Sequence, residues 1–323
     1  MRKLRNMFLT GMIVLFFVPG AALFAQYDIT DALGDVDEIA AAVNSIFGPN
    51  LGGMSYVGDP VGYAIIPHGA IGISAGATFI PLSNINTGTF MKVNFADMGS
   101  LAYFPIPAVG AHAKFTIKKK FELGVKVAGI PEINDKDAGA AVHNLIIGGK
   151  LRYNLVGFKL PMLKGGVSVG AHYEYMSGGL MMTESETIPI DVEGLGDAED
   201  GTFATTAGFE TMWKSGTFGG EVQANVQVLF LNFFAGSRVS TTVGKSTTTM
   251  KGTGTLTGDG SGVVVTEPTT TVNASQTVNP TGLDPYVFGG LELKILGLVI
   301  SGKLTYNIRN QNYVIDNGLR LQF

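Results

Sequence analysis

Apolar and polar residues alternate along most of the chain from Ala70 onward. In the first alternating segment Ile71, Ile73 and Phe79 fall on one face, and small or polar residues fall on the other. Because successive side chains of a β-strand point to opposite faces, the alternation predicts strands with one apolar and one polar face. Nine further segments repeat it, at residues 109–117, 121–127, 144–153, 167–175, 218–228, 233–243, 287–295, 298–309 and 313–323.

The alternation favours an all-β fold, namely an antiparallel transmembrane β-barrel. Charged residues avoid the apolar face of every segment, and the segments are about ten residues long, which suits a tilted strand that crosses a bilayer. Aromatic residues near the segment ends fit the interfacial girdles of such barrels. A soluble β-sandwich is the alternative, because it also has an apolar inner face.

Two stretches leave the strand number open. Residues 202–213 alternate well enough to form a strand, either within an external hairpin or joined to residues 218–228 in one long bulged strand. Residues 89–104 have room for another hairpin. The expected count is therefore about 10–14 strands, with about 12 as the best single value.

The polar faces direct charges of both signs toward the barrel interior. Opposite charges in a narrow lumen pair across it, so we expect a filled or constricted interior rather than a strongly ion-selective pore. The alternative is that these residues only solvate the inner wall. The candidate lumen-facing residues are Lys114, Glu122, Lys126, Lys150, Arg152, Glu174, Arg238, Lys303, Arg309 and Arg320.

The residues that precede the first strand divide into two parts. A basic start followed by an apolar run predicts a secretory signal peptide at residues 1–25. In the next part, residues 26–69, an apolar stripe over residues 35–47 predicts an amphipathic helix that Gly48-Pro49 ends. One such helix cannot bury its stripe alone. We therefore expect a plug-like helical segment in or under the mouth of a barrel formed by residues 70–323.

Composition agrees with export to a membrane. The chain is 46% hydrophobic and only 15% charged, with a mean hydropathy of +0.27, whereas an ordinary soluble domain has roughly a quarter of its residues charged. The absence of cysteine argues against a lipoprotein and a disulfide scaffold. Loss of the signal peptide removes three basic residues and no acidic one, so the net charge falls from −4 to −7. We therefore expect no nucleic-acid partner.

Two G-x-S-x-G strings, at residues 72–76 and 166–170, are the strongest hint of catalysis. A serine-hydrolase nucleophile requires a sharp strand-to-helix turn, but both serines lie mid-strand on the polar face. The two strings are better interpreted as small residues that face the lumen, and an outer-membrane lipid hydrolase is kept as a minor alternative.

The four histidines lack metal-ligand spacing, and His112 and His172 are expected in the lumen. The expectation is no enzyme, no metal and no cofactor.

Loop lengths predict the orientation of the barrel. Barrels of this type have short periplasmic turns and longer extracellular loops. The turns at residues 118–120 and 296–297 are therefore expected in the periplasm, and loops at residues 177–217 and 244–284 outside the cell. The second of these loops is rich in Thr, Gly and Ser, which fits a mobile surface loop or an extra β excursion.

The end of the chain resembles a known signal. Tyr313, Leu319, Leu321 and Phe323 share one face of the last strand, and the chain stops on the aromatic residue. Bacterial outer-membrane β-barrels carry a terminal strand of this kind as an assembly signal. The resemblance implies a location in the cell outer membrane, with outer-membrane lipids and the outer-membrane assembly machinery as partners.

The overall layout, a helical segment ahead of a barrel, resembles the FadL-type transporters of long-chain fatty acids and other hydrophobic molecules, whose N-terminal segment plugs the lumen. The Asn-Pro-Ala string of that family is absent, and the nearest strings are at residues 48–50 and 59–61, so no binding residue is transferred. The resemblance implies transport or binding of a small, hydrophobic solute. A structural or surface-exposed barrel, whose outer loops contact a host or partner, is the first alternative.

Overall fold

The structure is a computed structural model that describes most of the chain from residue 40 onward. The predicted signal peptide, the expected start of the helix at residue 35 and the stretch 89–102 lie outside the described residues. The described residues are 40–41, 44–45, 47–59, 68–81, 103–118, 120–135, 140–191, 200–260, 263–266, 270–280 and 282–323.

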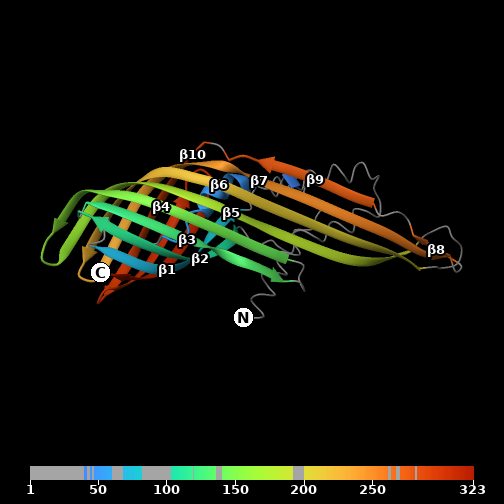
Figure 1. The fold of residues 1–323 in the computed structure, drawn as a ribbon, viewed down its shortest axis with the longest axis horizontal. Coiled ribbons are helices and arrows are strands. Elements are labelled where there is room, and N and C mark those ends of the chain that lie inside the picture. The colour runs from blue at the N-terminus through green and yellow to red at the C-terminus, as the bar shows by residue number, and fades with distance from the viewer. Residues whose placement is uncertain are drawn as a thin grey trace.

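All described strands belong to one antiparallel sheet, which curls into a barrel (Figure 1). The alternation of apolar and polar residues gives each strand one side for the interior and one for the exterior. The strands are β1 (Gly69–Pro81), β2 (Tyr103–Ile117), β3 (Phe121–Asp135), β4 (Ala140–Lys159), β5 (Leu163–Asp191), β6 (Asp200–Val228), β7 (Leu231–Gly260), β8 (Val263–Thr266), β9 (Thr270–Val278), β10 (Leu283–Ile295), β11 (Leu298–Asn307) and β12 (Tyr313–Gln322).

Ten of the described strands close the barrel. Strands β1 to β7 follow one another around the ring, β12 pairs with β1, and β10 pairs with β7, so that β10, β11 and β12 complete it. Strands β8 and β9 pair with the outer half of β7 and lie beyond the ring. The ring falls within the expected range, but a barrel of 12 strands is not confirmed. Closure gives every strand of the ring two neighbours, which limits the number of unpaired backbone groups, and such groups are costly in a bilayer.

The two ends of the barrel differ in the length of their connections. The short connections β2–β3, β4–β5, β6–β7 and β10–β11 lie at one end, which we call the turn end. The chain terminus meets the start of β1 at the same end, where the backbones of Gly69 and Phe323 exchange two hydrogen bonds of 3.0 Å. The opposite end is the extension end.

Strands β5, β6 and β7 run far past the ring at the extension end. They contain 29, 29 and 30 residues, whereas β11 and β12 contain 10 each. Their outer parts leave the barrel together and carry β8 and β9 (Figure 1). We call this ribbon the extension.

The extension replaces the loop expected at residues 177–217 with a paired hairpin, and in the described part of residues 244–284 it supports the extra β excursion rather than the mobile loop. Residues 177–191 and 200–217 pair as one hairpin without a register shift, and residues 244–260 continue β7. Residues 202–213 therefore join 218–228 in one strand, without the expected bulge. Thr, Gly and Ser give little contrast between apolar and polar positions, so alternation does not reveal strands there.

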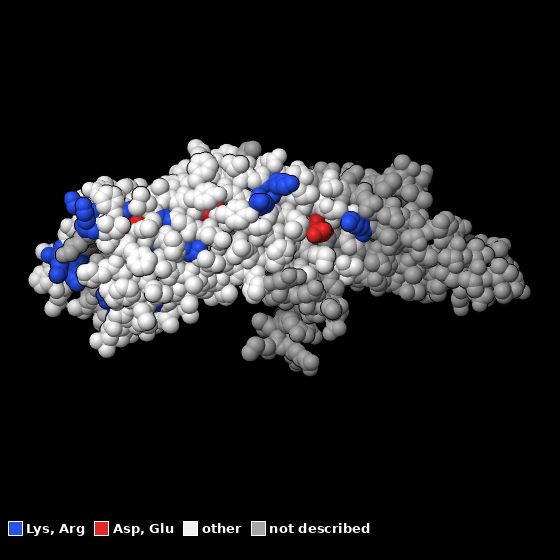
Figure 2. Space-filling model, in the orientation of Figure 1, with Lys and Arg blue, Asp and Glu red and all other residues white. Residues whose placement is uncertain are grey.

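Outward side chains give the barrel an apolar exterior. Ile73, Val109 and Phe218 are each at least half exposed, at 63%, 59% and 50%. Figure 2 shows a broad surface with few charged side chains between the turn end and the extension. An apolar exterior of this size is unstable in water and suits lipid. The predicted outward face of the strands is confirmed.

Aromatic side chains border the apolar exterior at both ends. At the extension end Phe79 stacks on Tyr313, with ring centroids 4.6 Å apart, and Tyr103 meets the same tyrosine edge-on at 4.9 Å. At the turn end Phe121 packs on Tyr153 at 4.9 Å. Aromatic rings at these two borders match the interfacial girdles of membrane barrels.

A helix lies inside the ring, and its described residues fall between residues 40 and 54. The expectation that Gly48-Pro49 ends it is wrong. The helix continues because Leu51 and Met54 are fully buried and Asn310 of the wall donates a hydrogen bond to the Pro49 carbonyl (2.8 Å). Tertiary contacts thus override the local preference. Among the described residues, none forms a helix long and apolar enough to cross a membrane.

The wall is irregular where β2 and β3 separate. These strands pair from Ile117↔Phe121 only as far as Val109↔Gly129, and β3 shifts its register against β4 just beyond. Gly129 has φ +151°, and a Cβ atom on it would lie 1.9 Å from the Asn144 carbonyl oxygen. Glycine is therefore required at this point of the wall.

Replacement of Gly129 by alanine is expected to destabilise the barrel by about 1–3 kcal/mol, because the new methyl group must displace the β4 backbone and occupy an unfavourable φ. The measurement is the temperature at which the folded band converts to the unfolded band on a gel. Gly149→Ala is the matched control, since a Cβ atom there meets only one backbone oxygen, at 4.0 Å. Equal transition temperatures for both variants would contradict the assignment.

Candidate functional site

The barrel interior brings together most residues predicted to face the lumen. Nine of the ten candidates project inward from the wall. Arg309 is the exception: it is exposed and lies in the turn after β11, because that strand ends at Asn307. The nine inward residues are Lys114, Glu122, Lys126, Lys150, Arg152, Glu174, Arg238, Lys303 and Arg320.

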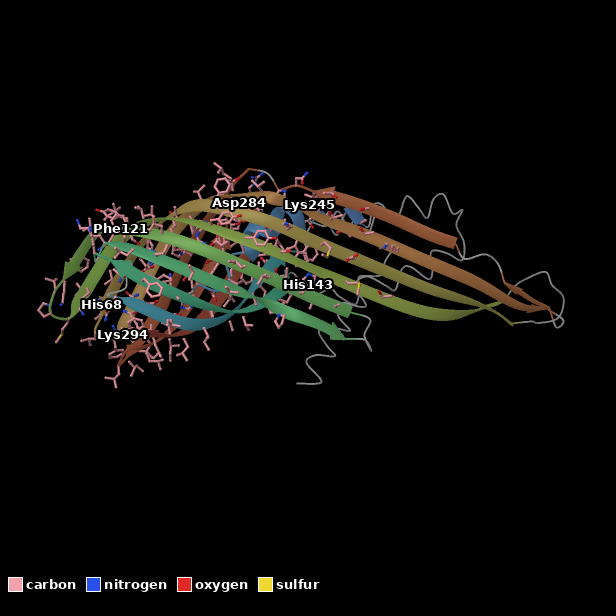
Figure 3. The ribbon with its side chains drawn as sticks, viewed as in Figure 1. His68, Phe121, His143, Lys245, Asp284 and Lys294 are labelled. Atoms are coloured by element: carbon pink, nitrogen blue, oxygen red, sulfur yellow. The ribbon has the colours of Figure 1, made fainter. Side chains whose placement is uncertain are left out.

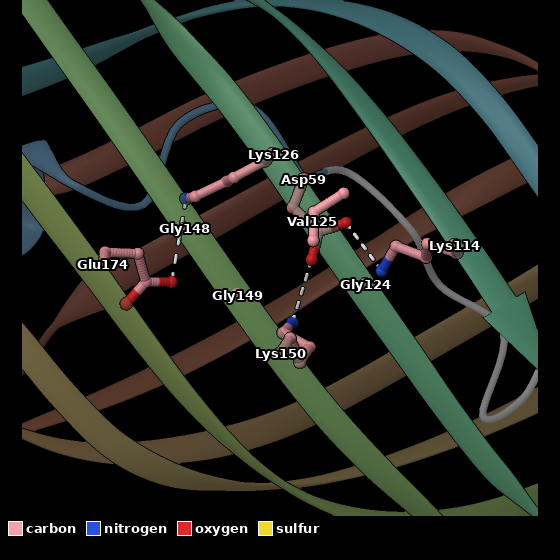
Figure 4. A pocket seen from close by; sticks show the side chains of 9 residues that line it. All are labelled: Asp59, Lys114, Gly124, Val125, Lys126, Gly148, Gly149, Lys150 and Glu174. Atoms are coloured by element: carbon pink, nitrogen blue, oxygen red, sulfur yellow. Dashed lines mark ion pairs between the residues drawn. The ribbon is translucent and has the colours of Figure 1, made fainter.

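Asp59, which follows the inner helix, is the centre of the interior. Its carboxylate lies 2.8 Å from the Lys114 ammonium and 2.9 Å from the Lys150 ammonium (Figure 4). Lys303 donates a hydrogen bond to the Asp59 backbone carbonyl at 2.5 Å. These lysines come from β2, β4 and β11, so one residue joins three parts of the wall. We call these contacts the Asp59 latch.

The backbone next to Asp59 is also held by the wall. The Asp316 carboxylate accepts hydrogen bonds from the Gly58 and Asp59 N–H groups, at 3.1 and 3.0 Å. Lys126 donates to the carbonyls of Ser55 and Val57, at 2.6 and 3.1 Å. These contacts satisfy polar groups that leave the helix and would otherwise be buried without partners.

Tyr56 anchors the same segment to the opposite side of the ring. Its hydroxyl and the Ser240 hydroxyl are 2.5 Å apart, and the Arg238 guanidinium lies 4.2 Å from the centre of its ring. Tyr286 packs edge-on against the ring at 4.7 Å. Burial raises the pKa of the Tyr56 phenol, so the phenol stays protonated at any physiological pH.

The helix contacts the wall near the extension end as well. Phe47 stacks on Trp213, with ring centroids 5.5 Å apart and planes at 7°. Trp213 in turn donates a hydrogen bond to Asn144 at 3.3 Å, and the Asn312 amide donates to Asn50. We refer to residues 40–59, where described, as the plug.

The wall charges form a network around the plug. Glu221 accepts a hydrogen bond from Arg238 at 2.6 Å and lies 3.1 Å from the Lys150 ammonium. A separate pair, Arg320 and Glu292, has a 2.7 Å contact. Among the described residues, the interior ion pairs use seven cations, Lys114, Lys126, Lys150, Arg152, Arg238, Lys303 and Arg320, and six carboxylates, Asp59, Glu122, Glu174, Glu221, Glu292 and Asp316.

Plug and network together fill this part of the lumen. The cavity beside Asp59 has a volume of only about 10 Å³, which is room for about one water molecule. Figure 4 shows the Lys114 and Lys150 ion pairs with Asp59 on one side of it and the Lys126–Glu174 pair, 3.7 Å long, on the other. Passage of a solute through this point therefore requires the plug to move.

A larger pocket lies in the wall where β2 and β3 separate. Its volume is about 540 Å³. Val109 and Leu145 belong to the exposed outer face, whereas Ala128 and Asn144 are buried on the inner face. Residues of both faces of the wall therefore line the pocket. It is lined by Val109, Val127, Ala128, Gly129, Ile130, Pro131, His143, Asn144 and Leu145.

The plug lies against the inner side of this wall pocket. Gly58 has φ +103°, and a Cβ atom on it would come within 2.8 Å of the Ala128 side chain, which lines the pocket. Lys126, two residues earlier on β3, holds the plug backbone. Strand β3 therefore forms part of both the wall pocket and the plug site.

The residues considered for catalysis are placed on the inner wall. Ser74 and Ser168 are buried mid-strand, and neither hydroxyl has a hydrogen-bond partner. Neither serine is therefore paired with a histidine as a nucleophile requires. His112 and His172 are buried inside, as expected. Within the described ranges, no group of His, Cys, Asp and Glu has the arrangement of a metal site.

The residues of the last strand that resemble an assembly signal face outward. Leu319, Leu321 and Phe323 are exposed on the outer surface, and Tyr313 joins the aromatic cluster at the extension end. The last strand thus runs from the extension end to the turn end. Their recognition by an assembly machinery stays a prediction.

Alternation does not single out the two plug residues at the heart of this site. Asp59 and Tyr56 lie in a segment without a period, so they were not candidates. Glu221, Glu292 and Asp316 lie on inward faces, but their roles depend on partners from distant strands. One signal was available for Asp59: no other acidic residue occurs between Glu38 and Asp97.

Substitution of Asp59 by asparagine is expected to release the plug. The change removes one carboxylate from two buried lysines, which among the described residues then keep only Glu122 at 3.6 Å and Glu221 at 3.1 Å, and breaking a buried ion pair costs up to about 3–5 kcal/mol. Trp213 is the chain's only tryptophan, and it loses its stacking partner Phe47 when the plug leaves. The measurements are therefore Trp213 emission and protease cleavage of the plug in the detergent-solubilised protein.

Glu292→Gln is the control for this experiment, because it breaks the Arg320 pair, which lies in the wall. It should destabilise the barrel without changing the Trp213 signal. Wild-type emission and protease resistance in the Asp59 variant would refute the latch.

Mild acid is not expected to release the plug as the mutation does. Burial raises the pKa of Asp59, but Lys114, Lys150 and Lys303 outweigh this effect and hold that pKa well below its usual range. The latch is therefore complete at neutral pH and is lost only below the ordinary range of an aspartate.

Comparisons with known proteins place the chain in a family. No curated protein matches the sequence. Similar solved structures include the translocator domain of the autotransporter NalP from Neisseria meningitidis (11% identity, 91% of this chain and 98% of that chain covered, TM-score 0.27) and a Pseudomonas aeruginosa FadL homologue (9%, 87% and 98%, 0.26). The outer membrane protease OmpT from Escherichia coli is a third (8%, 82% and 98%, 0.33). The family model described as Lsa36-like matches residues 48–323, and the chain belongs to this family.

Proposed function

We propose that this outer-membrane β-barrel binds a small hydrophobic solute at the wall pocket between β2 and β3. The observation that carries the proposal is the pocket itself, about 540 Å³ in volume, at the point where the two strands stop pairing. Ligand pockets in proteins are about 300–1,000 Å³, mostly apolar, with a few polar groups that orient the ligand. His143 and Asn144 are the polar residues of this one.

The position of the pocket supports a hydrophobic solute rather than a polar one. Val109 and Leu145 line it from the lipid-facing side, so a solute dissolved in the membrane can reach it without crossing water. The alternative entrance, along the barrel axis, is obstructed by the plug and its ion pairs. Binding at the wall is therefore the first step, and passage into the lumen requires the plug to yield.

Leu145→Trp is expected to weaken binding by about tenfold or more, because the indole occupies the pocket from the outer side; a tenfold loss corresponds to about 1.4 kcal/mol. The probe is tritiated toluene, and binding is measured with the full chain in nanodiscs. Ile147→Trp is the matched control. It lies two residues along β4 on the same exposed face but does not line the pocket.

Equal toluene binding by wild type and both tryptophan variants would reject the wall pocket as the site. Empty nanodiscs give the partition of toluene into lipid, which is subtracted. Loss of binding in both variants would also count against the proposal, since it would show a general effect of bulk on the outer face.

The extension favours a second function, the display of a β-ribbon at the cell surface. A strand of about 9–11 residues suffices to cross the membrane, whereas β5, β6 and β7 have 29 or 30. At about 3.3 Å per residue, the surplus projects tens of ångströms from the ring. A ribbon of this length gives a partner a surface well clear of the membrane.

Display at the surface is testable because the chain has no cysteine. Lys251→Cys places a thiol on the extension, and Lys120→Cys places one at the turn end; both lysines are exposed. In intact cells a membrane-impermeant maleimide should label the first and spare the second until the outer membrane is permeabilised. The reverse labelling pattern would show that the extension faces the periplasm, and it would rule out display at the cell surface.

A further inference from the structure

The outward face of β7 changes character where the extension leaves the barrel. Val239 and Val243 are exposed and apolar, at 47% and 65%. Lys245 follows on the same face, and it is exposed. Farther out the face is polar, with Thr247 and Thr249 within hydrogen-bond distance of β9 hydroxyls at 3.0 and 3.5 Å. Lys245 therefore lies at the border of the apolar exterior, on the side away from Lys294 and His68 (Figure 3).

A second lysine lies directly opposite the first. Lys214 of β6 is the register partner of Lys245, and it is also exposed. Side chains opposite each other on paired strands have Cβ atoms about 4.5–5.5 Å apart, and like charges there repel. Ser177 is the β5 neighbour of Lys214. Glu210, the nearest acidic residue along β6, lies two outward positions farther from the barrel and opposite Thr249.

An aromatic ring completes the patch on the barrel side. The Lys214 ammonium lies 5.8 Å from the centre of the Tyr175 ring. This cation–π contact directs the lysine along the wall rather than into solvent. Tyrosine at the membrane border also suits the headgroup layer, because its ring is apolar and its hydroxyl is polar.

We propose that Lys214 and Lys245 bind the phosphate of an anionic lipid in the outer leaflet. A phosphate between the two ammoniums removes their repulsion and offers each an acceptor oxygen. The acyl chains of the same lipid cover the exposed apolar residues below, Val243 and Tyr173 among them. A free phosphate ion lacks these chains, so the position of the patch selects a lipid.

The proposal is tested with the purified full chain in detergent and native mass spectrometry, which counts bound lipids. The probes are phosphatidic acid, phosphatidylcholine and inorganic phosphate. Lys214→Gln and Lys245→Gln should each weaken binding of phosphatidic acid by about tenfold. Lys251→Gln is the matched control, because Lys251 is exposed on the same outward face of β7 beyond the border, and it should bind as wild type does.

Three results would overturn the proposal. The first is equal binding of phosphatidic acid by wild type and both border variants. The second is an equal loss in the Lys251 variant, which would indicate a diffuse charge effect. The third is displacement of phosphatidic acid by an equal concentration of inorganic phosphate, which would indicate a site for the free anion. The heat-dependent band shift of each variant shows that the barrel has folded.

Discussion

The rest of the structure depends on the pairing of buried charges in the lumen. A membrane barrel turns its apolar side chains to lipid, so its polar side chains must share a narrow interior. Such groups are tolerated only when each finds a partner. The wall strands supply seven cations but only five carboxylates to the interior ion pairs of the described residues, and Asp59 of the plug supplies the sixth. The plug is thus part of the electrostatic balance of the wall.

Plug and wall pocket are adjacent because both contact strand β3. Strand β3 holds the plug backbone through Lys126 and lines the pocket through Ala128. The same strand loses its pairing with β2 at Gly129. The β2–β3 pairing therefore ends close to the place where the plug is held. The segment that β3 holds through Lys126 leads directly into Asp59, whose partners lie on β2, β4 and β11.

The sequence predicts the direction of the side chains more successfully than it predicts their contacts. Lys114 and Lys150 were placed inside by alternation alone, because the period of a strand assigns each residue to a face. Their shared partner Asp59 could not be found in this way, since it lies outside the strands and the contact depends on the closure of the ring. Pro49 illustrates the same limit: the local rule ends the helix there, but burial of the following turn extends it.

The outward face of β7 indicates how many residues of a strand face lipid, and this indication does not depend on the lengths of turns and loops. The exposed large apolar side chains of this face begin at Phe233, after the half-buried Leu231, and end at Val243, a span of 11 residues, and the complete strand β12 has 10. Both agree with the 9–11 residues that a tilted strand needs to span a bilayer. Lys245 is the next residue on this face, and β7 continues beyond it as far as Gly260. Strand pairing therefore continues past the residue at which the apolar pattern stops, and the paired residues beyond that point form the extension.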